Sequence, residues 1–229
     1  MLVSHKHKFI YTKTAKTGGT SIEYYFERFC LPDGEFTRSH ERDEYESETG
    51  IVGFRGKLLP EKVKWWNHMA AFQIKEQLGD EIWNSYFKFC SIRNPFERCI
   101  SHYEYAGKNL ERPLSEKIKR RFKNPFTSEE KRKFEYVLVH QPSIDRNKYL
   151  IDGEFCLDDV IRYENLEAEI ERICEKLSLP FEPKNIPKFK SDVRRPNTTI
   201  ESLYTKRSLA YVKKIYKYEI DKFGYEIPS

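Results

Sequence analysis

Apolar residues along the chain fall into short continuous runs and into helical spacings, and together these predict strands that alternate with helices. The strongest strand candidate is the run Y-F-K-F-C-S-I at 86–92, which polar residues bound on both sides. Shorter runs of the same kind predict strands at 8–12, 63–66 and 159–163. We expect these segments to form the sheet of the protein.

A helix is expected to begin at Thr20 or Ser21, because apolar side chains recur on one helical face at Ile22, Tyr25, Phe26 and Phe29. Further helices are predicted at 69–78, 95–107, 129–140, 164–177 and 208–223. Residues 33–56 form a long polar excursion. Strands alternating with helices imply an α/β protein in three layers, with a central, mostly parallel sheet flanked by helices. We expect residues 1–229 to form a single domain.

Composition agrees with a folded, globular chain. The 229 residues are 38% hydrophobic and 34% charged, and aromatic residues reach 15%, which a disordered chain would not contain. No apolar run approaches the roughly 18 residues of a membrane span, and the first residues hold no signal-peptide core. These features predict a cytoplasmic protein. The five cysteines form no C-x-x-C pair, which favours buried thiols over a zinc site or disulfides.

Charge is distributed unevenly around a net value of +5. Residues 108–133 hold ten basic side chains and four Glu, for a net charge of +6. Residues 33–48 carry a net charge of −5. Each segment is either a solvated face or, for the basic one, the border of a groove for a polyanion. The modest total charge does not predict a nucleic-acid partner.

The sharpest motif is the segment K-T-A-K-T-G-G-T-S at 13–21, between a predicted strand and a predicted helix. Gly18 and Gly19 allow the backbone to approach an anion, and the following helix adds its positive N-terminal end. Lys16 supplies a full charge, and Thr17, Thr20 and Ser21 supply hydroxyl donors. A purely structural Gly-Gly turn is the alternative. The lysine precedes the glycines, unlike the order in G-x-x-x-x-G-K-[ST], which disfavours a magnesium-dependent NTPase.

A second motif, C-S-I-R-N-P-F-E-R-C-I-S-H-Y, covers residues 90–103. Arg93 ends the strongest strand, at the sheet edge that carries the first motif, and Ser101 follows two helical turns later. A guanidinium and a hydroxyl suit a second phosphate group. An ion pair between Arg93 and Glu97 is the equal alternative.

In this order, the two motifs resemble those of the P-loop sulfotransferases, which use 3′-phosphoadenosine 5′-phosphosulfate (PAPS). The likeness is greatest to the carbohydrate O-sulfotransferases related to the heparan sulfate enzymes. It implies a P-loop-type fold, with residues 16–21 as the 5′-phosphosulfate loop and with Arg93 and Ser101 on the 3′-phosphate. Ala15 stands where that family usually has proline.

The resemblance also suggests which residues are catalytic. His68 matches the place of the family's catalytic histidine, and it is one of six histidines in the chain. Lys16 would contact the sulfonate and stabilise the leaving phosphate. Arg194 and Arg195 occupy a loop that family members close over the nucleotide, although a surface loop is an equal interpretation. This chemistry requires no metal.

The sequence therefore predicts a transferase that moves a sulfuryl group from PAPS to a hydroxyl acceptor and releases adenosine 3′,5′-bisphosphate (PAP). The expected acceptor is a carbohydrate, with a lipid, a small alcohol or a glycosylated metabolite as alternatives. Two other classes of function stay open. The first is a P-loop kinase of a small molecule, and the second is a non-catalytic polyanion or RNA-binding module that uses residues 108–133.

Overall fold

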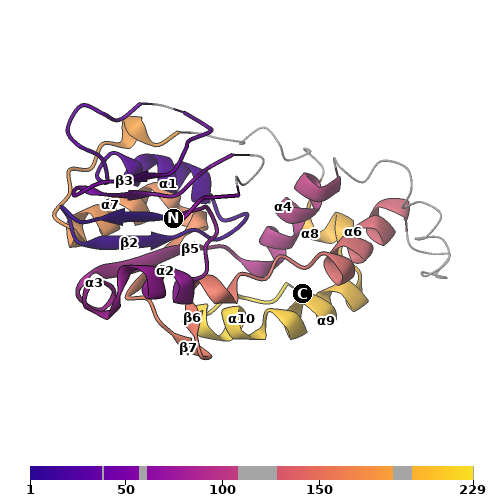
Figure 1. The fold of residues 1–229 in the computed structure, drawn as a ribbon. Helices are drawn as coiled ribbons and strands as arrows, with labels where there is room; N and C mark the ends of the chain where they lie inside the picture. The colour runs from indigo at the N-terminus through magenta and orange to yellow at the C-terminus, as the bar shows by residue number, and fades with distance from the viewer. Residues whose placement is uncertain (38, 57–60, 108–127, 188–197, 229) are drawn as a thin grey trace. The chain divides into compact units, whose positions relative to one another are not determined.

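The computed structural model describes residues 1–37, 39–56, 61–107, 128–187 and 198–228, and these form two compact units (Figure 1). The first unit comprises Met1–Ile92 and Asp145–Phe189, and the second comprises Arg93–Ile144 and Lys190–Ser229. Neither unit is continuous in the sequence. The single domain expected from the sequence therefore stays a prediction.

The first unit is built on a sheet of six described strands in the order β3-β4-β1-β2-β5-β8. Their bounds are β1 (Leu2–Ser4), β2 (Phe9–Thr12), β3 (Tyr45–Glu46), β4 (Gly50–Val52), β5 (Phe87–Ile92) and β8 (Asp159–Arg162). The neighbours β2, β5 and β8 pair in parallel, whereas β3, β4, β1 and β2 pair antiparallel. The α/β class is confirmed. The sheet is mixed, however, and its parallel part is limited to β2, β5 and β8.

Helices cover both faces of this sheet (Figure 1). On one face, α1 (Gly19–Glu27) and α7 (Leu166–Lys176) pack on Phe9, Tyr11 and Phe89 of the central strands. On the other side lie α2 (Ala71–Leu78) and α3 (Asp80–Ser85), where Trp83 lies near the Lys88 ammonium. This layering is the one that alternating strands and helices imply.

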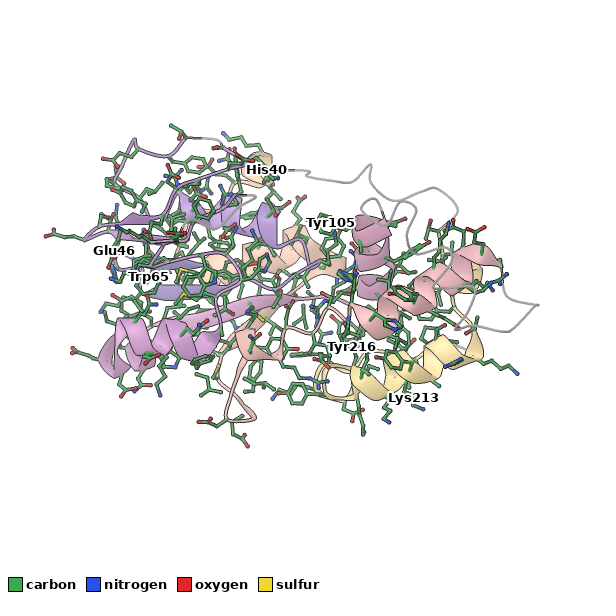
Figure 2. The ribbon with its side chains drawn as sticks, turned by 45° about the vertical axis from the view of Figure 1, so that its right-hand side comes forward. His40, Glu46, Trp65, Tyr105, Lys213 and Tyr216 are labelled. Atoms are coloured by element: carbon green, nitrogen blue, oxygen red, sulfur yellow. The ribbon has the colours of Figure 1, made fainter. Side chains whose placement is uncertain are left out.

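Most of the predicted helices and strands are confirmed within one or two residues, but the strand expected at 63–66 is wrong. In that segment only Trp66 makes a bridge, to Phe54. The backbone N–H groups of Lys64 and Trp65 donate instead to the Glu44 carboxylate, at 2.9 and 2.8 Å. The indole of Trp65 donates to Glu46 (Figure 2). Side-chain acceptors thus replace the strand partner that this segment would need.

The polar excursion at 33–56 contributes more to the fold than its composition indicates. It contains β3 and β4, which extend the sheet beyond β1. The hairpin of β6 (Leu150–Ile151) and β7 (Glu154–Phe155) was also not expected. Three short 3₁₀ helices complete the described elements of this unit: η1 (Arg146–Lys148), η2 (Tyr163–Asn165) and η3 (Pro183–Asn185).

The described part of the second unit is helical. Its helices are α4 (Pro95–Gly107), α6 (Glu129–His140), α8 (Ile200–Leu203), α9 (Lys206–Ile215) and α10 (Lys217–Phe223). The single helix expected at 208–223 is two helices, because Tyr216 leaves the helical conformation at φ −104° and ψ 21°. The Tyr216 side chain is buried, and its hydroxyl donates to the Ser143 carbonyl at 2.7 Å.

Cys30, Cys90, Cys99 and Cys174 are buried thiols, as expected, and Cys156 is half-buried. Among the described residues, no helix combines the length and the apolar character needed to cross a membrane.

Candidate functional site

The loop at 13–18 joins β2 to α1. Glycine is required at position 18, and at position 19 where α1 begins, for two different steric reasons. Gly18 lies in the left-handed region at φ 74° and precedes the first residue of α1. A Cβ on Gly19 would lie 3.0 Å from the Thr14 carbonyl oxygen and 3.1 Å from Cγ of Lys13. The loop can therefore turn this tightly only with glycine, or with a strained residue, at both positions.

The N-terminus of α1 opens toward this loop without a capping side chain, because glycine has none to offer. Ser21 and Ile22 donate their N–H groups to the Gly18 carbonyl. The N–H groups of Gly19 and Thr20, the first two residues of α1, have no acceptor within the helix and carry the positive end of the helix dipole. An anion at this point would satisfy them.

Lys16 and His68 share an unusual backbone conformation. Five described residues other than glycine have a positive φ, and they include Lys16 at 64° and His68 at 56°. A non-glycine residue in this region costs about 1 kcal/mol, and such strain concentrates at functional sites. The two residues expected to be catalytic are therefore both strained in this structure.

Behind the loop, four buried hydroxyl groups form a network that joins β2, the loop and β5. The Thr17 hydroxyl lies 2.8 Å from that of Ser91 and 2.7 Å from that of Thr14. Thr14 donates to the Ser91 carbonyl at 2.5 Å, and the Tyr11 hydroxyl lies 3.1 Å from that of Ser91. The Thr17 hydroxyl is thus directed into the protein. The half-buried Thr20 and the buried Ser21 lie in the first turn of α1.

A buried ion cluster fixes the start of the loop to α1. Lys13 Nζ donates to Glu23 Oε2 at 2.6 Å, and Arg55 reaches the same oxygen at 3.1 Å. The terminal amine of Met1 donates to Glu23 Oε1 at 3.1 Å. Burial opposes the charge of Glu23, but these three cations hold the pKa of the Glu23 carboxyl well below its usual range. Lys13 is consequently bound within the structure.

His68 lies directly against this loop. Its Nδ1 is 3.1 Å from the Lys13 carbonyl oxygen, which can only accept, so Nδ1 carries the proton. Nε2 makes no hydrogen bond to any of the described residues and keeps its lone pair as an acceptor. The residue is exposed to solvent, although its ring contacts the loop. Desolvation of the imidazolium, followed by repulsion from the Lys13 ammonium, lowers the pKa of His68 to about 4. His68 is therefore neutral at pH 7.

Asp145 also contacts the loop, and the sequence analysis did not identify it. Its Oδ2 accepts a hydrogen bond from the Ala15 N–H at 2.5 Å, and the residue is buried. Asp145 immediately precedes η1 and follows Ala15 by 130 positions in the sequence. No motif surrounds it, so the sequence offered no signal for this contact.

Tyr163 packs on the loop from η2. A Cβ on Gly18 would come within 2.8 Å of Cδ2 of the Tyr163 ring, so the ring lies on the glycine backbone. This contact is a further reason for glycine at position 18.

Most of the second motif, from Arg93 onward, belongs to the second unit. Arg93 follows the last residue of β5, and one of its terminal nitrogens lies 3.6 Å from a Glu97 carboxylate oxygen. This is the alternative partner that the sequence suggested. Asn94 accepts from the Phe96 N–H at 3.0 Å and caps α4, as expected, and Ser101 is half-buried on α4. Arg194 and Arg195 lie outside the described residues.

The residues available here would suit an anion rather than a metal ion. Within the described ranges, no three side chains of His, Cys, Asp or Glu gather as metal ligands would. The loop instead combines a lysine, a helix N-terminus and backbone N–H groups, with an imidazole at its base. A strand–loop–helix arrangement of this kind has the charges and donors that a phosphate-like group requires.

Comparison with known proteins identifies the family. The chain belongs to the sulfotransferase family, whose model matches residues 1–226. It is therefore related to enzymes that transfer sulfuryl groups. An uncharacterized protein of Archaeoglobus fulgidus is 27% identical over 114 residues, which cover 50% of this chain and 86% of that protein. No solved structure matches the chain.

Proposed function

We propose that this protein transfers a sulfuryl group from PAPS to the hydroxyl group of a carbohydrate, with His68 as the general base and Lys16 as the electrostatic catalyst. The observation that carries the proposal is the hydrogen bond between His68 Nδ1 and the Lys13 carbonyl. It places a neutral imidazole, with Nε2 available, at the residue where the phosphate loop begins.

The loop residues divide the binding of the donor between them. The backbone N–H groups of residues 17–20 and the hydroxyls of Thr20 and Ser21 would bind the 5′-phosphate at the N-terminus of α1. Thr17 contributes through its backbone, since its hydroxyl is engaged by Thr14 and Ser91. Gly18 and Gly19 keep the loop free of side chains. Arg93 and Ser101 would bind the 3′-phosphate, and this contact would distinguish PAPS from ATP.

His68 would accept the proton of the acceptor hydroxyl at Nε2 as the acceptor oxygen bonds to sulfur. The bond between sulfur and the bridging phosphate oxygen breaks in the same reaction, and bound PAPS supplies this sulfuryl group with PAP as the leaving group. Lys16 would stabilise the negative charge that develops on the bridging oxygen. The proton ends on His68, where the Lys13 carbonyl keeps the ring oriented.

The charges around His68 agree with its proposed role as a proton acceptor. Without nucleotide, the Lys13 ammonium and desolvation lower the pKa of His68, so the imidazole is neutral and can accept a proton. The negative charges of a bound donor would raise that pKa toward neutrality and make the base stronger when it is needed. Arg194 and Arg195 are proposed to contact the nucleotide as well, on the strength of the family resemblance alone.

A carbohydrate is proposed as the acceptor because of the resemblance to carbohydrate O-sulfotransferases. The decisive experiment measures transfer of labelled sulfuryl from PAPS to a panel of glycans, lipids and small alcohols. Transfer to glycans supports the proposal, and transfer to another class alone would correct the acceptor. A thermal-shift comparison of PAP with ATP and Mg²⁺ tests the donor independently. Stabilisation by ATP and Mg²⁺ alone would replace the proposed reaction with that of a kinase.

A further inference from the structure

His68 and Asp145 come from two distant segments and contact the backbone of Lys13 and Ala15, two residues that only Thr14 separates in the loop. His68 Nδ1 donates to the Lys13 carbonyl at 3.1 Å, and Asp145 Oδ2 accepts from the Ala15 N–H at 2.5 Å. Between them, Thr14 is bound to Ser91 of β5. Each of the three residues at the start of the loop therefore has a specific partner.

We infer that Asp145 is a positioning residue with two separable effects: its carboxylate oxygen fixes the start of the phosphate loop through the Ala15 N–H, and its negative charge lies two loop residues away from the contact of His68. The inference deepens the proposed function, and it rests on that function only for the identity of the nucleotide. Asp145 does not itself contact the reacting atoms in this assignment.

The identity of residue 15 makes this contact possible. Alanine has a backbone N–H that can donate to Asp145, whereas proline would have none. A buried carboxylate requires a hydrogen-bond donor, and a short N–H···O⁻ bond is stronger than one between neutral groups. Ala15 and Asp145 thus form a complementary pair.

Charged groups from four segments act on His68. The Lys13 ammonium and the Met1 terminal amine disfavour the imidazolium, whereas the carboxylates of Asp145 and Glu23 favour it. Glu23 also forms ion pairs with Lys13, Met1 and Arg55. The Asp145 charge also acts on the buried Lys148. Burial lowers the pKa of the Lys148 ammonium, and the Asp145 carboxylate opposes that effect. Asp145 is therefore a source of negative charge beside both the loop and the base.

This charge has opposite effects on the two functions of the site. A negative charge beside the loop repels an anionic ligand, but it strengthens the neighbouring base. Removing the charge alone should therefore leave nucleotide affinity unchanged or improve it, while the base becomes weaker. A residue that merely supports the fold would not separate these two effects.

Two substitutions separate the charge from the hydrogen bond. Asp145→Asn keeps an oxygen that can accept from Ala15 and removes the charge. Ala15→Pro removes the donor and keeps the charge. Asp158→Asn is the matched control. Asp158 also accepts a hydrogen bond from a backbone N–H, that of Lys88 at 2.7 Å, but near the N-terminal end of β5 and away from the loop. Folding of each variant is checked by circular dichroism and thermal unfolding.

The readouts are the titration of the His68 resonances by NMR, calorimetry with PAP, and the pH profile of kcat/KM. In Asp145→Asn, we expect the His68 titration and the acidic limb of the profile to move to lower pH by about 0.5–1 unit, with PAP binding at least as tight as in the wild type. In Ala15→Pro, we expect PAP affinity to fall by about threefold to tenfold and the His68 titration to move less. Asp158→Asn should alter none of these.

The inference is overturned if Asp145→Asn leaves the His68 titration where it is in the wild type, or if Ala15→Pro binds PAP as tightly as the wild type does. Failure of the wild-type protein to bind PAP would overturn the proposed donor instead. The titration of His68 in Asp145→Asn would still decide the role of Asp145 in that event, because it requires no nucleotide.

Discussion

The Lys13 carbonyl accepts a hydrogen bond from His68 Nδ1 at 3.1 Å, although the two residues are 55 positions apart. The same residue, Lys13, binds Glu23 of α1 through its ammonium group. His68, the proposed base, and helix α1 behind the loop are thus attached to one residue. This arrangement fixes which nitrogen of the imidazole is protonated and leaves Nε2 as a hydrogen-bond acceptor.

The first prediction concerns His68. His68→Ala should lower kcat by about 10²–10⁴-fold, which is the usual contribution of a positioned general base. PAP affinity should change less than threefold, because the base contacts the acceptor. Steady-state kinetics with PAPS and calorimetry with PAP measure the two effects. His7→Ala, at a half-buried histidine outside the loop, serves as the control. A normal rate in His68→Ala would show that another group is the base.

The second prediction separates the two interpretations of Arg93, whose guanidinium lies 3.6 Å from Glu97. Arg93→Ala should weaken PAP binding by about 1.5–3 kcal/mol, the range for a hydrogen bond to a charged group. Glu97→Gln removes the same ion pair but keeps the guanidinium, so PAP binding should stay equal or become tighter. Calorimetry on both variants decides the question. Equal losses of affinity in the two would mean that Arg93 acts through Glu97.

Local chemistry made the phosphate loop predictable from the sequence. Its boundaries depend on a strand, two glycines and the amphipathic helix that follows, and β2 and α1 lie where these signals indicate. The cap of α4 by Asn94 was predictable for the same reason. Such features are encoded within a few neighbouring residues.

Long-range partners were not predictable in this way. Asp145 reaches Ala15 across 130 positions, and Glu44 replaces a strand partner for Lys64 and Trp65 across about 20. β1 is only three residues long and gains its partners from β2 and β4, which lie on either side of it. The propensity of a short segment does not reveal such pairings, because they depend on which surfaces the fold brings together.

The third prediction concerns the single domain expected from the sequence. The chain passes between the two units three times, after Ile92, Ile144 and Phe189, so each unit is built from two separate segments. We expect one cooperative thermal transition, with equal calorimetric and van't Hoff enthalpies. Differential scanning calorimetry of the whole chain measures both quantities. Two resolved transitions would mean that the units are separate domains.

The fourth prediction follows from the lowered pKa of Glu23. A carboxyl whose pKa is lower in the folded state adds stability at pH values above its unfolded pKa of about 4.5, and this stability is lost as the pH falls below that value. Glu23→Gln leaves Lys13 and Arg55 without their shared acceptor. We therefore expect a loss of about 3–5 kcal/mol in the free energy of unfolding at pH 7.

The pH dependence provides the sharper test of that cluster. Between pH 7 and pH 3, urea unfolding should show a smaller decline of stability in Glu23→Gln than in the wild type, because the substituted side chain does not titrate. Glu76→Gln, on the exposed side of α2, is the matched control and should follow the wild type. An equal decline in wild type and Glu23→Gln would assign the acid sensitivity to other carboxyls.

The last prediction uses the strained backbone of Lys16, at φ 64°. Lys16→Ala and Lys16→Gly both remove the ammonium, but only glycine adopts this conformation without strain. Both variants should lose turnover by the same large factor, with a smaller loss of PAP affinity, because the charge matters most as the leaving phosphate forms. Lys16→Gly should nevertheless unfold at a higher temperature than Lys16→Ala, by an amount equivalent to about 1 kcal/mol. Thermal unfolding and single-turnover kinetics measure the two properties separately. If both variants retained normal turnover, the strain at Lys16 would serve the fold of the loop and not the reaction.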